Sequence, residues 1–334
     1  MKNYSIFIGV DISKLTLDIV GINSKNSIVK NSLEINNNIK GIKKYFNKLL
    51  ADNPKEKIIV CFENTGLYGY YLSTTLSELK IDYAIVPALE IHLSKGLVRG
   101  KSDKKDALMI AHYLLSNQFK IKLSTLNEFD IDKLKTLNSQ RDKIVKSISI
   151  FRQTYESKNF LPKALTKETY CINDSIVKNL KKNLLKIEKE IDKIINANDN
   201  LKTNYNLVKS IPGIGPQTSI YLLIVTKNFT AFSDARKLAC YAGVAPFPYQ
   251  SGTSINGRTK VHHFADKKLK SLINMCALNA KRWDAQISTY YEKKVAEGKN
   301  KMLVMNNVRN KLLHRVFAVI KRQTPYVNTY KFVA

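Results

Sequence analysis

The chain has 334 residues, of which 44% are hydrophobic and 25% charged, so it is long enough for two or three domains with ordinary cores. No run approaches the roughly 18 uninterrupted apolar residues of a membrane span, and the segment MKNYSIFIGVDIS reaches a charge too soon for a secretory signal. We therefore expect a cytoplasmic protein with no membrane partner. The four cysteines are far apart, which argues against a zinc site and against a disulfide framework.

The net charge is the strongest signal in the composition. With 55 Lys and Arg against 27 Asp and Glu, the chain carries +28, which indicates a polyanionic partner. The excess is greatest after residue 200, where 22 basic residues stand against five acidic ones. We expect this last third of the chain to provide the main surface for that partner.

Residues 1–122 follow the pattern of an α/β domain. Asp11 and Glu63 end two apolar runs that read as buried strands, and sites in open α/β sheets form at the edge where such strands end. The expected elements are strands at 4–10, 15–21 and 27–35, a helix at 39–50, a strand at 57–62, a helix at 68–79, a strand at 83–86 and a helix from 103.

The stretch KSDKKDALMIAHY, residues 101–113, places two more acids at the start of that last helix. Asp103 and Asp106 share one face because they are three residues apart. Acids in a first helical turn most often serve capping and solubility. Here Lys101, Lys104 and Lys105 crowd the same segment, which favours contact with a phosphate-bearing substrate.

These four acids would converge in a ribonuclease-H-like sheet, which brings its first and fourth strands side by side and packs a late helix against them. Clustered carboxylates repel one another unless cations hold them, and oxygen ligands select Mg²⁺ or Mn²⁺. Two such ions about 4 Å apart support phosphodiester chemistry. An actin-like ATPase or sugar kinase also begins with a strand and an Asp, but no glycine-containing phosphate turn follows Asp11.

Residues 123–200 change character to long helices, expected at 129–160 and 175–197. Apolar residues recur there at helical spacing with Lys and Glu on the other faces. The two helices would form a hairpin or coiled coil. Its role is either that of a spacer or that of an oligomerisation element, and the narrow apolar stripes favour a homo-oligomer, a dimer or a tetramer.

Residues 201–334 begin with a second specific pattern, the PGIG turn between two apolar helical segments. This is typical of a helix-hairpin-helix, in which backbone N–H groups contact a DNA phosphate. The alternative is a structural turn between packed helices. Because the turn lies in the most basic segment, we favour phosphate contact at Gly213 and Gly215.

A loop is expected after Gly243, where two prolines precede a run rich in Ser and Gly. Ser251 and Ser254 are the serines of interest, because Arg258 and Lys260 lie close enough in sequence to offset charge on a phosphate under attack. Basic amphipathic helices are expected at 267–280 and 301–322. The aromatic residues between these helices are expected in the core rather than as base-stacking platforms; they are Trp283, Tyr290 and Tyr291.

Together these segments resemble the DEDD transposases of the insertion-sequence-110 family over nearly the whole chain. The segments that carry the resemblance are GVDISK, FENTGLYGYYL, KSDKKDA, PGIGPQTS and GVAPFPYQSG, followed by a basic helical tail. The resemblance implies a RuvC-like N-terminal domain, a coiled-coil linker and a C-terminal transposase domain with a serine. The segment VHHFADKKLK departs from many relatives in lacking their Gly- and Arg-rich run.

The resemblance also implies roles for particular residues and partners. The serine falls on Ser251, with Ser254 as a near neighbour, and would form a phosphoserine link with DNA. Members also use an RNA from the element's non-coding end, and the two half-sites come from different protomers of a tetramer. The four acids of the family name fall on Asp11, Glu63, Asp103 and Asp106, and they would hold Mg²⁺.

We therefore expect a nucleoid-associated, RNA-guided DNA transposase or recombinase. The runner-up is a metal-dependent nuclease of the Holliday-junction-resolving type, which would leave no protein attached to DNA. A third hypothesis is a nucleic-acid-binding scaffold with vestigial acids, which would show salt-dependent binding and no metal-dependent activity.

Overall fold

The structure is a computed structural model that describes residues 3–94, 103–125, 129–153, 160–251, 255–261 and 265–328. Within these ranges the side chains at 31, 32, 103, 104, 163, 248, 249, 251, 255, 256 and 258–260 are not described. The chain divides into two compact units, residues 1–126 and 127–334. We refer to them as the N-terminal and C-terminal units.

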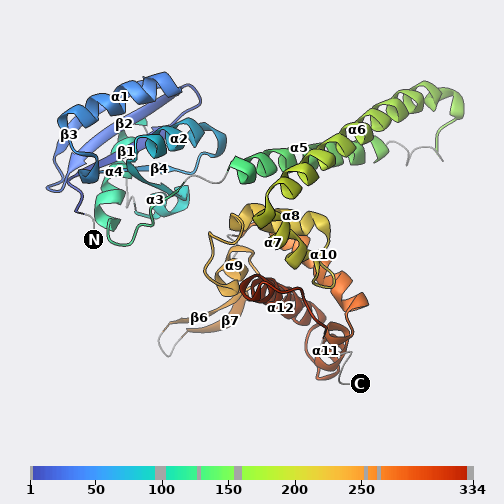
Figure 1. Cartoon of the computed structure of the whole chain (residues 1–334). Helices are drawn as coiled ribbons and strands as arrows, with labels where there is room; N and C mark the ends of the chain where they lie inside the picture. The colour runs from blue at the N-terminus through green and yellow to red at the C-terminus, as the bar shows by residue number, and fades with distance from the viewer. Residues whose placement is uncertain are drawn as a thin grey trace. The chain divides into compact units, whose positions relative to one another are not determined.

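The N-terminal unit is a five-stranded mixed sheet in the order β3-β2-β1-β4-β5 (Figure 1). Strand β2 pairs antiparallel with both β1 and β3. On the other side of β1, β4 pairs parallel with β1, and β5 pairs parallel with β4. The sequence predicted the succession of the strands along the chain and the pairing of the first and fourth strands, but not the short helix at Ala88–Ser94. The strands are β1 (Ile6–Ile12), β2 (Thr16–Asn23), β3 (Ile28–Asn36), β4 (Ile58–Glu63) and β5 (Asp82–Val86).

Helices cover both faces of this sheet. Phe46 of α1 and Leu76 of α2 pack with Val10 on one face, while Ala111 of α4 packs with Phe7 and Cys61 on the other. The β4 run is apolar throughout because both of its faces are covered. The helices are α1 (Ile39–Asp52), α2 (Tyr70–Glu78), α3 (Ala88–Ser94) and α4 (Asp103–Asn117), with short 3-10 turns at Lys55–Lys57 and Gly66–Gly69.

The C-terminal unit begins with the expected helical hairpin, α5 (Phe129–Gln153) and α6 (Lys163–Ala197). Helix α6 starts 12 residues earlier than the sequence predicted. Apolar residues on facing sides, among them Ile144, Ile148 and Val177, hold the two helices together. The hairpin is therefore a continuous packed pair of helices within the unit.

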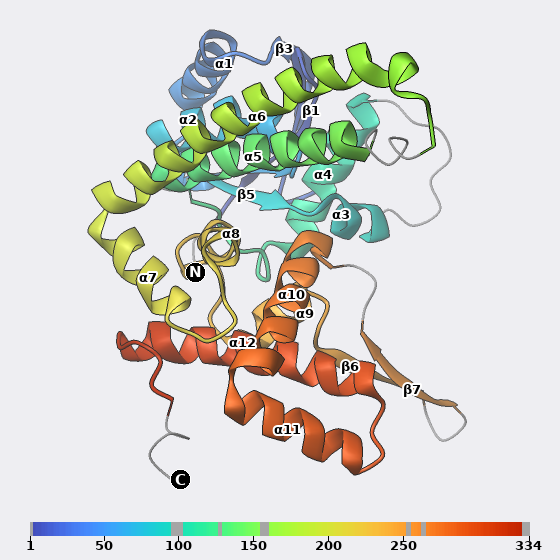
Figure 2. The same cartoon turned by 90° about the vertical axis from the view of Figure 1, so that its right-hand side faces the viewer.

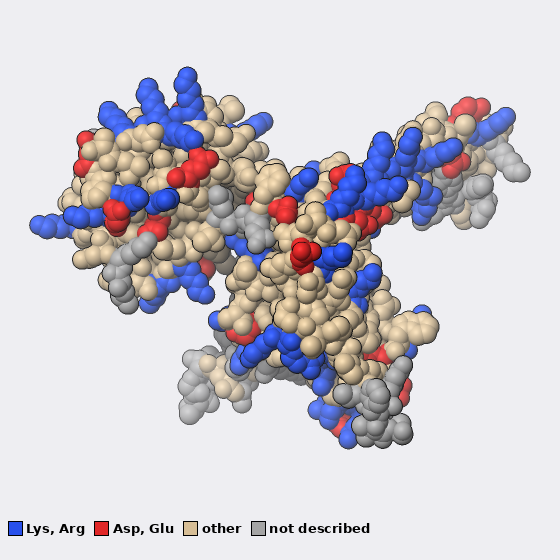
Figure 3. Space-filling model, viewed as in Figure 1, with Lys and Arg blue, Asp and Glu red and all other residues tan. Residues whose placement is uncertain are grey.

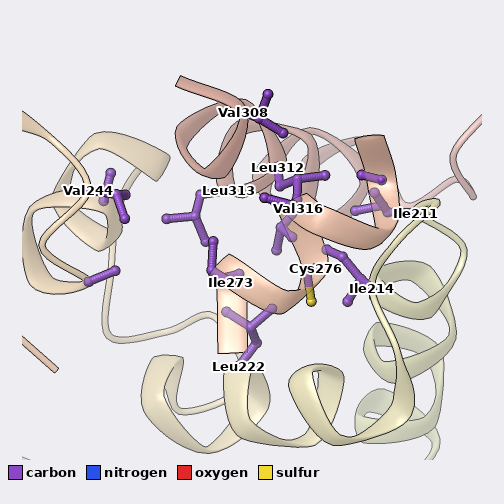
Figure 4. Close-up of a cluster of buried hydrophobic side chains, with 14 of the residues drawn as sticks. Ile211, Ile214, Leu222, Val244, Ile273, Cys276, Val308, Leu312, Leu313 and Val316 are labelled. Atoms are coloured by element: carbon purple, nitrogen blue, oxygen red, sulfur yellow. The ribbon is translucent and has the colours of Figure 1, made fainter. Parts of the chain in front are cut away.

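Helices α7 to α12 enclose the largest hydrophobic core found among the described residues (Figure 4). Leu222 of α8, Ile273 of α10 and Leu312 of α12 are fully or almost fully buried in it. Asn or Asp side chains cap most of these helices at their N-termini. The helices are α7 (Asp199–Lys209), α8 (Pro216–Thr226), α9 (Ala235–Tyr241), α10 (Lys267–Trp283), α11 (Ala285–Ala296) and α12 (Lys301–Arg322).

Two features of the C-terminal unit differ from the sequence expectation. The expected loop contains a β-hairpin, β6 (Pro246–Ser251) and β7 (Ile255–Val261), whose register shifts at the position of Pro248. Pairing across the hairpin supplies the strand structure that a proline-rich sequence conceals. Trp283 is 76% exposed, so its expected place in the core was wrong, whereas Tyr291 is buried.

None of the described helices combines the length and the apolar character that crossing a membrane requires. The four cysteines are all free thiols, and Cys61 and Cys276 are buried.

Candidate functional site

Asp11 and Glu63 lie on neighbouring strands and on the same face of the sheet. Gly9 of β1 pairs with Cys61 of β4, and the two acids follow two residues further along their strands. Gly9 and Cys61 both face α4, and side chains two residues apart on a strand share a face. Both carboxylates are half-buried. The structure therefore brings together the two strand-end acids that the sequence singled out.

Helix α4 crosses that face in the direction opposite to β1. The middle of the helix packs in one core with Phe7, and further along the strand a Cβ on Gly9 would come within 2.1 Å of the Ala107 carbonyl oxygen. Asp103 starts the helix about one turn before Ala107. Because a helical turn advances about 5.4 Å and two strand residues about 6.6 Å, the start of α4 lies over the strand end that carries Asp11.

The predicted acidic helix start is described only in part. Asp106 is half-buried and Lys105 is exposed. Lys101 lies outside the described residues, as do the side chains of Asp103 and Lys104. Among the described side chains, which exclude that of Asp103, no group of three His, Cys, Asp or Glu could hold a metal ion. The four-acid metal site therefore stays a prediction.

A further acid lies in the same row across the sheet. Asp18 of β2 pairs directly with Asp11, and Glu34 of β3 pairs with Asp18. Asp18 is only 6% exposed, whereas Glu34 is exposed. Like charges directly opposite on paired strands destabilise a sheet. The row of carboxylates thus concentrates negative charge on the side of the sheet that α4 covers.

The thiol beneath this row stays neutral at physiological pH. Burial raises the pKa of Cys61 to about 12, and the nearby charge of Glu63 acts in the same direction. A neutral, buried thiol is neither a good nucleophile nor a metal ligand. Of the groups described at this edge, the carboxylates rather than this thiol are therefore the candidates for chemistry.

The β6–β7 hairpin, in which β6 ends at Ser251, projects from the helices of its unit in both views (Figures 1 and 2). Ser251 is the last residue of β6 and pairs with Ile255, but its side chain is not described. Ser254 lies outside the described residues. Arg258 and Lys260 belong to β7, where only their backbone is described.

A polar cluster fixes the foot of the hairpin. Tyr221 of α8 donates a hydrogen bond of 2.8 Å from its hydroxyl to Asp266, and the Tyr241 hydroxyl donates a longer one of 3.3 Å to the same oxygen. The Asp266 carboxylate also accepts the backbone N–H of Leu269 and so caps α10. Just before β6, the Asn306 amide donates to the Val244 carbonyl oxygen at 2.8 Å. Both legs of the hairpin are thus anchored to helices.

The PGIG turn joins α7 to α8 and packs against α10. Gly213 has φ +91°, and a Cβ there would lie 2.7 Å from the Cys276 carbonyl oxygen, so packing alone requires this glycine. Gly215 has no atom within 4 Å of its Cβ position. Its backbone N–H bonds to the Cys276 thiol, whose pKa burial raises and this bond lowers. Phosphate contact at the two glycines stays a prediction.

Known proteins match the chain over almost its whole length. It is 28% identical over 326 residues to the pilin gene-inverting protein of Moraxella lacunata. This alignment covers 96% of this chain and 97% of the relative. The pilin gene-inverting protein of Moraxella bovis matches with the same identity and coverage. An uncharacterized 43.6 kDa protein of insertion element IS110 from Streptomyces coelicolor is 31% identical over 120 residues, 36% of this chain and 29% of that protein.

Two family models match successive segments of the chain. A transposase model of the DEDD class named after IS110 matches residues 8–165, and the model described as Transposase IS116/IS110/IS902 family matches residues 205–292. The chain belongs to the IS110 family of transposases. An IS110-family transposase is an enzyme that recombines DNA, and DNA is therefore its partner.

In this IS110-family transposase, each matched segment contains one of the two groups of predicted residues. Residues 8–165 include the row of carboxylates and the start of α4, and residues 205–292 include the PGIG turn and the serine hairpin. Sequence reasoning missed Asp18, although an Asp inside an otherwise apolar strand was a visible signal. It also missed Tyr221 and Asp266, because a tyrosine in an apolar helix reads as a core residue.

Proposed function

We propose that this protein is an RNA-guided DNA transposase that breaks and rejoins DNA through a phosphoserine link at Ser251 and a divalent-metal site at the four acids. The single observation that carries the acidic half is the shared face of Asp11 and Glu63, with the start of α4 over the same strand end. This topology supports a ribonuclease-H-like, RuvC-like domain.

The donor chemistry fits a hard divalent cation. Asp11, Glu63, Asp103 and Asp106 would supply carboxylate oxygens, which Mg²⁺ and Mn²⁺ prefer. When bound, such an ion would neutralise charge on the reacting phosphate. Both described strand-end acids are half-buried rather than sealed, so solvent reaches them.

Ser251 would act as the nucleophile. Its Oγ attacks the phosphorus of a DNA phosphodiester and gives up its proton, and the bond from phosphorus to one sugar oxygen breaks. The released sugar oxygen takes up a proton, so one ester replaces another. Attack by a different strand's hydroxyl on the phosphoserine reverses the exchange and joins new ends. A place at the end of a projecting hairpin supports this role, because it is compatible with entry into a DNA-bound site.

Charge and shape support the partners of this reaction. Basic side chains gather along the α5–α6 hairpin in Figure 3, and the segment after residue 200 carries the largest positive excess of the chain. Exposed apolar residues on the same hairpin, including Ile150, Ile172 and Leu185, support assembly of copies through these helices. We propose a dimer or tetramer that binds guide RNA as well as donor and target DNA.

The full-length match to two pilin gene-inverting proteins favours a second outcome of the same chemistry. An enzyme that exchanges strands at two sites inverts the DNA between them when the sites oppose each other in orientation. We therefore propose inversion of a DNA segment as a candidate activity beside insertion.

Capture of the covalent intermediate tests this proposal. The full chain is incubated with Mg²⁺, end-labelled DNA and RNA from the flanking locus, then resolved under denaturing conditions. We expect a labelled protein–DNA adduct that Ser251→Ala abolishes and the matched Ser254→Ala retains, while both variants still bind DNA. An adduct lost only in Ser254→Ala would move the nucleophile three residues. Cleavage without any adduct would favour the metal-dependent nuclease.

A further inference from the structure

A polar cavity of about 450 Å³ lies within the C-terminal unit between α5, α8 and the foot of the β6–β7 hairpin. Helices α5 and α8 pack against each other here, as Figure 1 shows. The volume falls in the range of roughly 300–1,000 Å³ that is typical of small-ligand sites. The catalytic residues proposed above do not line this cavity, so it needs an explanation of its own.

Asn138 of α5 presents a buried amide to this cavity. Its side chain is 5% exposed and lines the cavity, yet it has no hydrogen-bond partner among the described residues. The amide lines the cavity and is not one of the sealed, unsatisfied polar groups of the described core, so its donor and acceptor are open to a ligand there. Ile131 and Ile224 provide an apolar floor beside it. An unpaired amide above an apolar floor suits a flat ligand with hydrogen-bonding groups on its edge.

One end of the cavity is cationic. Lys227 follows α8 and is the first of three consecutive non-glycine residues in the left-handed region, with φ of 49°, 54° and 66°. Backbone strain of this kind is retained mainly at functional sites. Burial lowers the pKa of the half-buried Lys227, while nearby Asp132 opposes this and Lys135 adds to it. No ion pair of Lys227 or Lys135 is found among the described residues.

At the other end of the cavity the charged side chains are already paired with one another or hydrogen-bonded. Lys268 pairs with Asp142 and lies 4.4 Å from the centre of the Tyr221 ring. The hydroxyls of Tyr221 and Tyr241 donate to Asp266. Tyr241 is 44% exposed, and the edge contact of its ring is with Phe232. From Lys135 to Asp142 along α5 is seven residues, or about 10 Å. The cavity therefore has cations at one end, an unpaired amide in the middle and an exposed aromatic ring at the other end.

We propose that this cavity binds one unpaired nucleotide of the nucleic acid, with its base at Asn138 and its phosphate at Lys227 and Lys135. The amide offers a donor and an acceptor to a base edge, and Tyr241 offers a ring for stacking. Paired bases cannot enter, because a base in a duplex must first leave the stack. The inference rests on the nucleic-acid partner of the proposed function and is independent of Ser251 chemistry.

Binding of short oligonucleotides tests the proposal. Fluorescence anisotropy would be measured without metal on the full chain carrying Ser251→Ala, with single-stranded DNA, single-stranded RNA and duplex DNA of one sequence. We expect Asn138→Leu to weaken binding of a single strand about tenfold, the loss of one good base contact, and to leave duplex affinity unchanged. Asn183→Leu, an exposed position on α6, is the matched control.

A lysine pair tests the phosphate contact separately. Lys135→Gln with Lys227→Gln should reduce the slope of log affinity against log salt by about 0.7 per lysine on a single strand. Lys44→Gln with Lys48→Gln changes the same charge at exposed positions of α1 and should leave both the salt slope and the Asn138 dependence intact. Whichever strand shows the Asn138 dependence, DNA or RNA, is the source of the nucleotide.

Unfolding measurements separate binding from structure. Because Asn138 is unpaired in the fold, Asn138→Leu should keep or raise the midpoint of thermal unfolding while binding weakens. If that variant fails to fold, Asn138→Ser replaces it. The serine keeps a polar group, but its single hydroxyl cannot present a donor and an acceptor side by side to a base edge. Single-strand affinity that is indifferent to Asn138, or duplex affinity that falls equally, would overturn this site while leaving the adduct test of Ser251 untouched.

Discussion

Asp18 on β2 lies directly opposite Asp11 on β1, and its side chain is only 6% exposed. Asp18 belongs to the same row of carboxylates as Glu63, because Asp11 continues the pairing of β1 with β4. Two acids facing each other repel, and a bound cation relieves this repulsion. Asp18 is thus coupled to any ion held at Asp11 without being one of the four acids of the family.

We therefore predict that Asp18→Asn weakens the response of the protein to divalent metal. Mg²⁺ should raise the thermal midpoint of the wild type, and this rise should be smaller in Asp18→Asn and absent in Asp11→Asn.

Glu34→Gln provides the matched control, since Glu34 pairs with Asp18 one strand further from Asp11 and is exposed. Its response to Mg²⁺ should equal that of the wild type. Equal metal responses in Asp18→Asn and in the wild type would contradict the coupling of Asp18 to the site.

The closeness of β1 and α4 leads to a second prediction. A Cβ on Gly9 would lie 2.1 Å from the Ala107 carbonyl oxygen and 2.4 Å from the Ala111 nitrogen, both backbone atoms that cannot rotate away. Gly9→Ala should push α4 off the sheet, lower the stability of the N-terminal unit by roughly 1–3 kcal/mol and displace the start of α4 from Asp11. Urea unfolding measures the first effect and strand cleavage the second.

Gly69→Ala is the control in the same unit. Its Cβ would meet side-chain atoms of Ile12 and Phe62 at 3.5 Å, an ordinary contact, and its φ is −81°. We expect no loss of stability. A Gly9→Ala protein as stable and active as the wild type would contradict the close approach of α4.

The sequence predicted most of the N-terminal unit because its signals are local. Apolar runs that stop at Asp11 and Glu63 mark buried strands whatever their partners are. Asp18 escaped attention because its importance arises from the antiparallel register with Asp11, which is not visible in the sequence. The β6–β7 hairpin was hidden for a similar reason, since cross-strand pairing overrides the preference of Pro246 and Pro248 for irregular structure.

The C-terminal helices divide in the same way. The expected range 301–322 of α12 matches the structure, because its amphipathic pattern and flanking cap are local. Trp283 was misjudged because large aromatic residues are usually buried, whereas the end of α10 leaves this one 76% exposed. Whether an aromatic residue at a helix end is buried depends on tertiary packing, and the sequence around Trp283 does not indicate that packing.

The two glycines of the PGIG turn give a third prediction, because packing treats them differently. Gly213→Ala should destabilise the C-terminal unit, since its φ is +91° and the added carbon meets α10. Gly215→Ala should fold normally, because its Cβ position is open. If the turn contacts a phosphate, Gly215→Ala crowds that contact and should lower duplex DNA affinity in an anisotropy titration.

Two comparisons make the outcome specific. A loss of affinity that shrinks as salt is raised would match a phosphate contact, and the thermal midpoint should stay at the wild-type value. Unchanged affinity in Gly215→Ala would show that the turn serves only to pack α7 and α8 against α10.

The hydrogen bonds at the foot of the serine hairpin give a prediction of pH dependence. Burial, followed by the hydrogen bond to Asp266, raises the pKa of Tyr221 above its usual value near 10. Because the folded-state pKa is raised, this contribution to stability is complete below pH 10 and disappears as pH rises through the folded-state pKa. Tyr221→Phe lacks the hydrogen-bond donor at every pH. At pH 8 its free energy of unfolding should therefore be about 1 kcal/mol below that of the wild type, the net contribution of one hydrogen bond.

Urea unfolding would be measured at pH 8 and above pH 10. The difference in free energy of unfolding between the wild type and Tyr221→Phe should become smaller as pH rises. Tyr68→Phe, at an exposed position of the N-terminal unit, should show no gap at pH 8. If Asp266 orients the hairpin through Tyr221, the variant should also form the Ser251 adduct more slowly while its DNA affinity is unchanged. A gap that widens above pH 10 would contradict the raised pKa, and unchanged adduct formation would limit Tyr221 to a structural role.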